Sequence, residues 1–131
     1  MIGIGADIID IRRIEKTIIR FGNKFKKRIF TDEEINKCEG RKLSINCYAK
    51  RYAAKEAASK ALGTGFRKGV FWRDLEVSNL PSGQPTIIFH GGAKKQLEAI
   101  SLANNKPNIN LTITDEYPYA QAIVIIEGTY K

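Results

Sequence analysis

The stretch RYAAKEAASKALGTG, residues 51–65, contains the clearest indication of the fold, because it predicts a helix that other elements can approach closely. Its alanines recur at positions that share a helix face, so this face can pack closely against another backbone. The helical pattern begins at about Ile45 and ends at Leu62, and Gly63 suits the position after a helix end, where a positive φ is common. We therefore predict a long, closely packed helix. It nevertheless carries the charged residues Arg51, Lys55, Glu56 and Lys60.

A strand and two shorter helices are predicted before this long helix. Ile and Gly alternate up to Ala6, as in a strand that ends near Asp7, and isoleucines then recur at helical spacing. Asp10 is the predicted N-cap of this first helix, and Gly22 is its predicted end. Thr31 opens the capping-box pattern TDEEI, so a second helix is expected to begin there.

The second half of the chain is predicted to consist mostly of strands. Two strand patterns, WRDLEVSNL and TIIFH, flank the turn PSGQP, and two more, NINLTIT and YAQAIVIIE, flank DEYP. A helical pattern over residues 92–103 lies between the two pairs. We find no linker or repeat, so residues 1–131 are expected to form a single α+β domain with an antiparallel sheet packed against the long central helix.

The chain is basic, with a formal net charge of +8, and the excess lies in the N-terminal half. A basic surface attracts an acidic protein, nucleic acid or an anionic membrane. The longest apolar run, residues 122–126, is far shorter than the roughly 20 residues that span a bilayer. The N-terminus has no signal-peptide pattern, so we expect a cytoplasmic protein without a membrane partner.

Two residue types limit the chemistry available to the chain. Cys38 and Cys47 have no metal-ligand spacing and, without a secretion signal, are expected to be reduced thiols. His90 is the only histidine and is expected to be a partly buried structural residue. Catalysis by a serine or cysteine nucleophile therefore has no support in the sequence.

Asp7 and Glu56 are candidate metal ligands. Glu56 and Lys60 lie four positions apart and so share a helix face, which by itself favours an ordinary surface ion pair. The alternative is that the helix presents both side chains to a cleft, where Asp7 supplies a second carboxylate. Mg²⁺ typically takes one or two carboxylates together with substrate phosphates and water, so such a cleft would suit it.

Together, these motifs resemble the holo-acyl-carrier-protein synthase family, the small bacterial 4'-phosphopantetheinyl transferases. GIGADIIDIRRI is similar to the N-terminal motif of the family, RIFTDEE to its next signature, and RYAAKEAASKALGTG to its most diagnostic one. The segment DLEVSN followed by SGQP also fits, so the resemblance covers nearly the whole chain. It implies transfer of phosphopantetheine from coenzyme A to a serine of apo-acyl carrier protein in fatty acid biosynthesis, with release of adenosine 3',5'-bisphosphate. It also implies a homotrimer with active sites between subunits.

The resemblance assigns roles to particular residues. Asp7 and Glu56 would bind Mg²⁺, and Lys60 would act beside the pyrophosphate of coenzyme A. Arg51 would bind a coenzyme A phosphate, and the coenzyme would further contact Gly63, Gly83 and Pro85. The proton acceptor for the serine stays open between Glu56, a metal-bound water and solvent.

The basic first helix is expected to bind the carrier protein, because carrier proteins are small and acidic and opposite potentials speed encounter. The resemblance implies this contact for Arg13 of the helix. We extend it to further basic residues of this helix and of the segment after it, so that the candidates are Arg12, Arg13, Lys16, Arg20 and Arg28.

One position departs from the pattern of the family. Thr114-Asp115 stands where members commonly have Ser-His or Thr-His before the last strand. A carboxylate cannot make the same favourable contact with a phosphate and would repel it. We therefore expect Asp115 to be dispensable for catalysis.

A nucleic-acid-binding module is the alternative from another class of function. The net charge and the interleaving of Phe21, Phe25 and Phe30 with Lys and Arg would suit it, although Asp7 and Glu56 would then have no role. Another Mg²⁺-dependent nucleotide enzyme, with the same acidic pair and a different substrate, is a third possibility.

Overall fold

The computed structural model describes residues 2–101 and 105–130. In chain order the elements are β1 (Gly3–Asp10), α1 (Ile11–Phe21), α2 (Asn23–Ile29), α3 (Asp32–Glu39), α4 (Ser44–Leu62), the 3-10 turn η1 (Trp72–Asp74), β2 (Leu75–Asn79), β3 (Pro85–Phe89), α5 (Gly91–Ile100), β4 (Asn105–Glu116) and β5 (Tyr119–Tyr130). Among the described helices, none is both long and apolar enough to cross a membrane.

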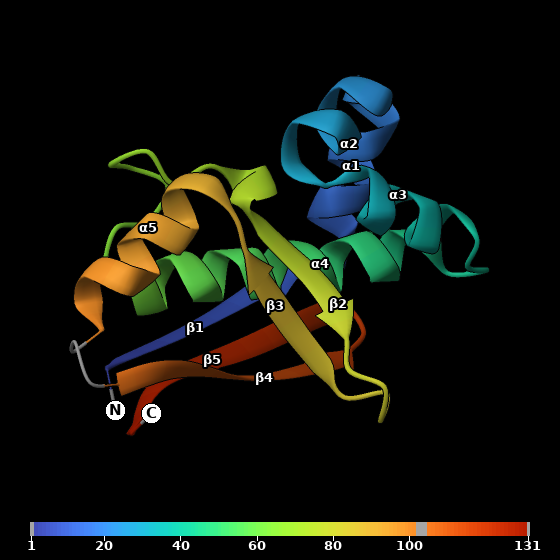
Figure 1. Cartoon of the computed structure of the whole chain (residues 1–131). Helices are drawn as coiled ribbons and strands as arrows, with labels where there is room; N and C mark the ends of the chain where they lie inside the picture. The colour runs from blue at the N-terminus through green and yellow to red at the C-terminus, as the bar shows by residue number, and fades with distance from the viewer. Residues whose placement is uncertain (1, 102–104, 131) are drawn as a thin grey trace.

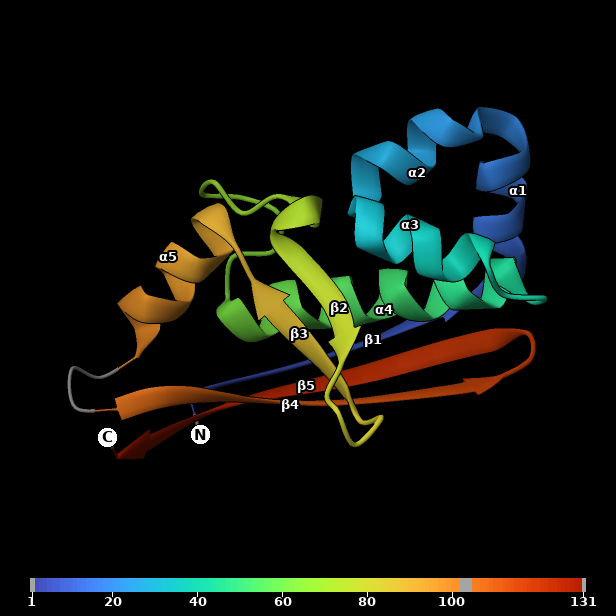
Figure 2. The ribbon, with the colours of Figure 1, turned by 45° about the vertical axis from the view of Figure 1, so that its right-hand side comes forward.

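Helix α4 lies along one face of a three-stranded antiparallel sheet with the order β1-β5-β4 (Figure 1). Strands β2 and β3 form a separate antiparallel hairpin that crosses α4 and reaches β4. Helices α1, α2 and α3 gather over the N-terminal end of α4, whereas α5 lies near its other end (Figures 1 and 2). The predicted α+β fold with antiparallel sheets is therefore confirmed.

Strand β1 and helix α4 pack backbone against backbone. A Cβ atom added to Gly5 would lie 1.9 Å from the carbonyl oxygen of Ala57, and one added to Gly3 would lie 2.0 Å from that of Ala61. Real Cβ atoms do not approach backbone atoms so closely, so only glycine fits at these two strand positions. The pairing of glycine on β1 with alanine on α4 therefore sets the distance between these elements.

Gly5→Ala is expected to lower the free energy of unfolding by about 3 kcal/mol or more, because an added methyl group in a filled contact forces the backbones apart. Urea denaturation measures this change. Gly40→Ala is the matched control, because Gly40 has an ordinary φ of −80° and its added Cβ would meet atoms only at 3.6 Å and beyond. Equal stabilities of the two variants would contradict the proposed contact.

On the face of the sheet opposite α4, the part formed by β1 and β5 is largely apolar and open. Ile4 and Ile8 on β1 are 57% and 60% exposed. Ile4 pairs with Ile125 and Ala6 with Ile123, and directly paired residues project to the same side of a sheet. We call this open patch, formed by Ile4, Ala6, Ile8, Ile123 and Ile125, the outer sheet face.

The caps that the sequence predicted are present. The Asp10 side chain accepts a hydrogen bond from the Arg12 backbone N–H, and the Gly22 backbone N–H closes the end of α1. Thr31 and Glu34 form the predicted capping box at the start of α3. These three signals are local, which explains why a sequence pattern suffices to find them.

Four predictions about the elements were wrong or incomplete. The strand predicted from Trp72 begins only at Leu75, because Trp72–Asp74 form the 3-10 turn η1. β1 continues past Asp7 to Asp10, because its pairing with β5 runs on to Tyr119, so Ile8 belongs to the strand. Helix α2 was not predicted; Gly22, with a φ of 55°, ends α1 and lets the chain turn directly into α2. The helix predicted over 92–103 ends at Ile100 as α5, and 102–104 fall outside the described residues.

The expectation of two reduced thiols was also wrong, because the structure joins Cys38 of α3 to Cys47 of α4 in a disulfide. The turn between these helices is short and brings the two Cα atoms to 5.4 Å, within the range of disulfides. Spacing along the sequence does not reveal this contact, since it depends on how the two helices pack.

Candidate functional site

Lys60 of α4 binds Asp7 of β1. Its ammonium group lies 3.0 Å from the Asp7 carboxylate and also donates a hydrogen bond to the carbonyl oxygen of Ala6 at 3.0 Å. In the described part of the chain, Glu56 makes no ion pair with Lys60. The surface pair between Glu56 and Lys60, which their spacing favoured, is therefore not formed, and Lys60 turns to the strand instead.

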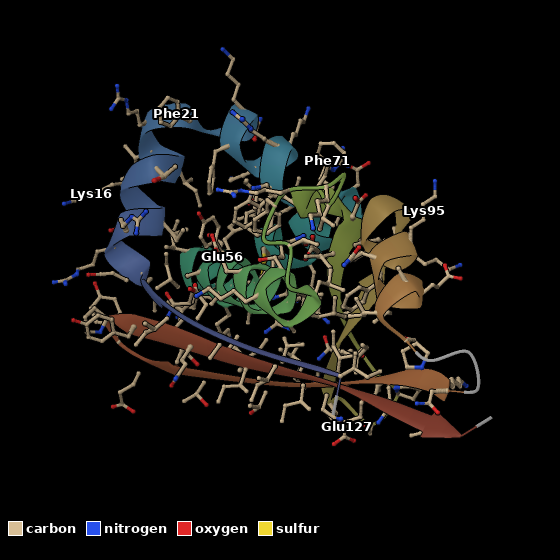
Figure 3. All side chains as sticks on the ribbon, turned by 90° about the vertical axis from the view of Figure 1, so that its left-hand side faces the viewer. Lys16, Phe21, Glu56, Phe71, Lys95 and Glu127 are labelled. Atoms are coloured by element: carbon tan, nitrogen blue, oxygen red, sulfur yellow. A yellow bond between two sulfur atoms is a disulfide. The ribbon has the colours of Figure 1, made fainter. Side chains whose placement is uncertain are left out.

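Glu56 shares its surroundings with Asp7. The pKa of Glu56 is raised, first by burial and second by the negative charge of Asp7, while the positive charges of Lys60 and Arg13 act in the opposite direction. In Figure 3, Glu56 lies on α4, with α1 on one side and the segment that carries Phe71 on the other. We call Asp7, Glu56 and Lys60 the carboxylate cluster. The charge of Asp7 disfavours ionisation of Glu56, and a bound cation would offset this effect.

The carboxylate cluster fits Mg²⁺ by the chemistry of its donors. Both acidic ligands are oxygen donors, and hard cations such as Mg²⁺ prefer oxygen. Within the residues that the structure describes, no group of three or more His, Cys, Asp or Glu gathers to hold a metal. The protein would therefore supply two carboxylates and leave the other coordination positions to substrate phosphates and water.

A row of stacked aromatic rings lies beside the carboxylate cluster. Tyr52 stacks on Trp72 at 4.7 Å between ring centroids, and Trp72 stacks on Phe66 at 3.7 Å. The pKa of Tyr52 is raised, first by burial and then by the charge of Glu56. Sequence reasoning missed this row, although Tyr52 lies four positions before Glu56 and so shares its helix face.

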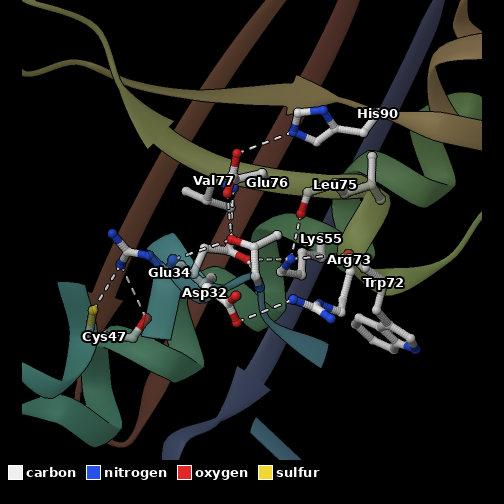
Figure 4. Close-up of polar contacts among 12 residues, drawn as sticks. Asp32, Glu34, Cys47, Lys55, Trp72, Arg73, Leu75, Glu76, Val77 and His90 are labelled. Atoms are coloured by element: carbon white, nitrogen blue, oxygen red, sulfur yellow. Dashed lines mark hydrogen bonds and ion pairs between the residues drawn. The ribbon is translucent and has the colours of Figure 1, made fainter. Parts of the chain in front are cut away.

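Lys55 has a structural role in this helix. It is fully buried, and its ammonium group lies 2.7 Å from the equally buried Glu34 carboxylate (Figure 4). It also donates to the carbonyl oxygens of Trp72 and Leu75, while Glu34 accepts from the backbone N–H of Val77. The pair therefore joins α3, α4 and β2, and it holds the aromatic row in place through Trp72.

Helices α1 and α2 carry many basic side chains and enclose a largely apolar hollow between them. Arg13, Lys16 and Arg20 are exposed on α1, whereas Arg12 is held by Asp10 at 2.7 Å. Arg20 lies over the ring of Phe21, 5.0 Å from its centroid. The hollow between the helices measures about 560 Å³ and is lined by Thr17, Phe21, Lys24, Phe25 and Arg28. We call this region the α1–α2 surface.

Arg51 lies in a second basic region. It is 6% exposed, and its guanidinium donates to the carbonyl oxygen of Cys47 at 3.4 Å and to the Cys47 sulfur at 3.0 Å. Among the residues that the structure describes, its Nε atom is buried and has no hydrogen-bond partner. Burial lowers the pKa of this guanidinium. An unpartnered donor on a buried cation is suited to an anionic ligand.

Two adjoining hollows of about 180 and 280 Å³ open next to Arg51. Arg41, Lys50 and Asp115 line both, and Pro85 lines the first. We call the two hollows together the Arg51 pocket. The two glycines expected to bind coenzyme A line neither hollow: Gly63 ends α4 with a φ of 83°, and Gly83 lies in the turn between β2 and β3.

The carboxylate cluster and the Arg51 pocket lie on opposite sides of one chain. Arg51 precedes Lys60 by nine positions, about two and a half helical turns, so the two side chains leave α4 in opposite directions. The cluster borders β1 and the pocket borders β4, and these are the two edge strands of the sheet. The structure therefore does not bring Arg51 to Asp7, Glu56 and Lys60, whereas Pro85 lines the same hollow as Arg51.

Three comparisons with known proteins point to the same family. Residues 3–122 match the 4'-phosphopantetheinyl transferase superfamily. The chain is 61% identical to holo-[acyl-carrier-protein] synthase of Rhizobium rhizogenes over 98% of its own length and 96% of that protein. Its fold is similar to the crystal structure of the corresponding synthase from Neisseria meningitidis, with a TM-score of 0.86, 34% identity and coverage of 97% and 98%. The synthase from Helicobacter pylori, crystallised in complex with coenzyme A, matches with a TM-score of 0.77, 33% identity and coverage of 95% and 99%.

Proposed function

The chain belongs to the 4'-phosphopantetheinyl transferase superfamily, among the holo-[acyl-carrier-protein] synthases, and on this premise we propose that it transfers phosphopantetheine from coenzyme A to a serine of apo-acyl carrier protein. Adenosine 3',5'-bisphosphate is the second product, and the carrier protein then serves fatty acid biosynthesis in the cytoplasm. The observation that carries the proposal is the carboxylate cluster, which combines two carboxylates with a lysine at one edge of the sheet.

The chief obstacle to this reaction is negative charge. Mg²⁺ held by Asp7 and Glu56 would neutralise the pyrophosphate of coenzyme A and stabilise the leaving phosphate. Lys60 holds a second positive charge at the same edge, and its contacts with Asp7 and Ala6 fix the direction of its ammonium group. Fixed charges of this kind need little rearrangement when the phosphorus is attacked, which is how they lower the barrier.

An assay by intact mass tests the proposal. With coenzyme A, Mg²⁺ and apo-acyl carrier protein, the carrier is expected to gain the mass of one phosphopantetheine group. EDTA should abolish the gain and added Mg²⁺ should restore it, while a carrier without its acceptor serine should gain nothing. No adduct under any condition, together with a salt-dependent gel shift of DNA or RNA, would favour the nucleic-acid-binding alternative.

The α1–α2 surface is the proposed docking site for the carrier protein. Its exposed cations complement an acidic partner, and its hollow offers the rings of Phe21 and Phe25 to an apolar side chain. Lys16→Glu with Arg20→Glu is expected to raise the KM for carrier protein about tenfold or more, because like charges then oppose encounter. The KM for coenzyme A should stay the same, as steady-state kinetics with each substrate varied in turn will measure.

The matched control for this charge reversal is Lys95→Glu on α5, far from α1 in Figure 3. Its KM for carrier protein should change little. Raised salt should weaken capture of the carrier more than turnover at saturation, because screening acts on exposed charges. Equal effects of the α1 and α5 reversals would contradict the assignment of the α1–α2 surface.

We further propose that the active site forms between copies of the chain in a homotrimer. The carboxylate cluster and the Arg51 pocket lie on opposite sides of α4, so one coenzyme A would meet the cluster of one copy and the pocket of another. The outer sheet face supports this proposal, because the exposed side chains of Ile4 and Ile8 form an apolar patch that a second copy would bury.

A further inference from the structure

Asp115 is the acidic residue among the described side chains that line the Arg51 pocket. The basic side chains of this lining are Arg41, Lys42, Lys50 and Arg51. Over residues 2–101 and 105–130, none of these four makes an ion pair with a carboxylate. The pocket therefore holds an excess of positive charge, and Asp115 offsets part of it.

The position of Asp115 follows from the alternation of β4. Leu111 is buried and Ile113 is half-buried, and the two-residue period of a strand places Asp115 on the same face. Its backbone is held by pairing with Ala120 of β5. Glu116 takes the other face and lines neither hollow. On this face of β4, Asp115 thus follows the apolar residues Leu111 and Ile113, and its carboxylate lies where the strand meets the Arg51 pocket.

We propose that Asp115 is a specificity-determining residue that weakens the hold of the Arg51 pocket on the phosphate monoester of coenzyme A. The inference rests on the proposed function, which assigns a coenzyme A phosphate to Arg51. Four basic side chains without a counter-charge would bind a phosphate dianion tightly, and they would bind the nucleoside bisphosphate product just as tightly. A carboxylate in the same pocket repels both and speeds release of the product.

Calorimetric titration with adenosine 3',5'-bisphosphate tests the proposal at fixed salt. Asp115→Asn is expected to lower the Kd about three- to tenfold, the effect of one charge at a distance of several ångströms in a partly hydrated pocket. Glu116→Gln, the neighbouring carboxylate on the other face, should change the Kd by less than about twofold. With dephospho-coenzyme A, which lacks the phosphate monoester, Asp115→Asn should bind as the unaltered protein does. In transfer assays, Asp115→Asn should lower the KM for coenzyme A without raising kcat.

Weaker or unchanged binding of the bisphosphate by Asp115→Asn overturns the proposal. A comparison of thermal unfolding midpoints establishes that the variant is folded, and Asp115→Ser provides a second neutral replacement. Arg51→Ala distinguishes failure of the proposed role of Asp115 from failure of the phosphate site assigned to Arg51. If Arg51→Ala weakens binding and Asp115→Asn does not tighten it, only the role of Asp115 fails. If Arg51→Ala leaves binding unchanged, the phosphate lies elsewhere and both assignments fail.

Discussion

Glu56→Gln is expected to lower kcat/KM for phosphopantetheine transfer by about a hundredfold to a thousandfold, and Asp7→Asn by a similar factor. Each change removes one of the two anionic donors proposed for Mg²⁺ and so weakens the charge stabilisation on which the reaction depends. The measurement is the initial rate of adduct formation on the carrier protein over a range of Mg²⁺ concentrations. A rate that falls less than about tenfold at saturating Mg²⁺ would contradict the role of these carboxylates.

The stability of Glu56→Gln distinguishes a functional from a structural role. The pKa of Glu56 is raised in the folded protein, so its ionised form is disfavoured there relative to the unfolded chain. Stability is thus lost as pH rises through the folded pKa, and without Mg²⁺ the variant should be at least as stable as the unaltered protein at pH 8. The difference in stability between the two proteins should vanish at low pH, where Glu56 is protonated and therefore as neutral as the glutamine that replaces it. A variant destabilised at pH 8 would indicate that Glu56 serves the fold.

A mixture of two inactive variants is expected to recover activity. Arg51→Ala removes the anion site of the Arg51 pocket, and Glu56→Gln disables the carboxylate cluster. If each active site takes its cluster from one copy and its pocket from another, random co-assembly leaves roughly a quarter of the sites with both halves intact. The two chains, expressed together, should therefore show activity well above that of either variant alone.

The control for this experiment is a mixture of Glu56→Gln with Asp7→Asn. Both changes lie in the carboxylate cluster, so every mixed site still carries one defect and no recovery is expected. If each site were built within one chain, the mixture with Arg51→Ala would also show no more than the mean activity of its components. Size-exclusion chromatography with light scattering would establish the oligomeric state of each mixture.

Local patterns were sufficient for much of the fold. The capping box at Thr31 and the N-cap at Asp10 depend on residues within one helical turn, so the sequence shows them directly. The alternation of Ile with Gly predicted a strand, but which face of that strand would be buried could not be predicted. Gly3 and Gly5 face α4, and Ile4 and Ile8 face outward, because the helix approaches too closely for a side chain at the two glycine positions.

The candidate site was predictable only in part. Asp7, Glu56 and Lys60 are recognisable as motif residues, and the structure brings the lysine to the strand carboxylate. That Arg51 leaves α4 on the opposite side follows from the helical period, yet its importance appears only when the edge strands are known. The buried pairing of Lys55 with Glu34 depends on contacts between distant parts of the chain, which no local pattern encodes.

The contact between β1 and α4 has a consequence for how exactly the two candidate metal ligands are held. In most proteins, a strand and a helix are separated by a layer of side chains that can change rotamers and absorb a mutation. Here main-chain atoms meet directly at Gly3 and Gly5, two residues from Asp7 at the nearest. The distance between β1, which carries Asp7, and α4, which carries Glu56, is thus set by covalent geometry and van der Waals radii. Substitutions elsewhere in the core can therefore alter stability while leaving the distance between β1 and α4 unchanged.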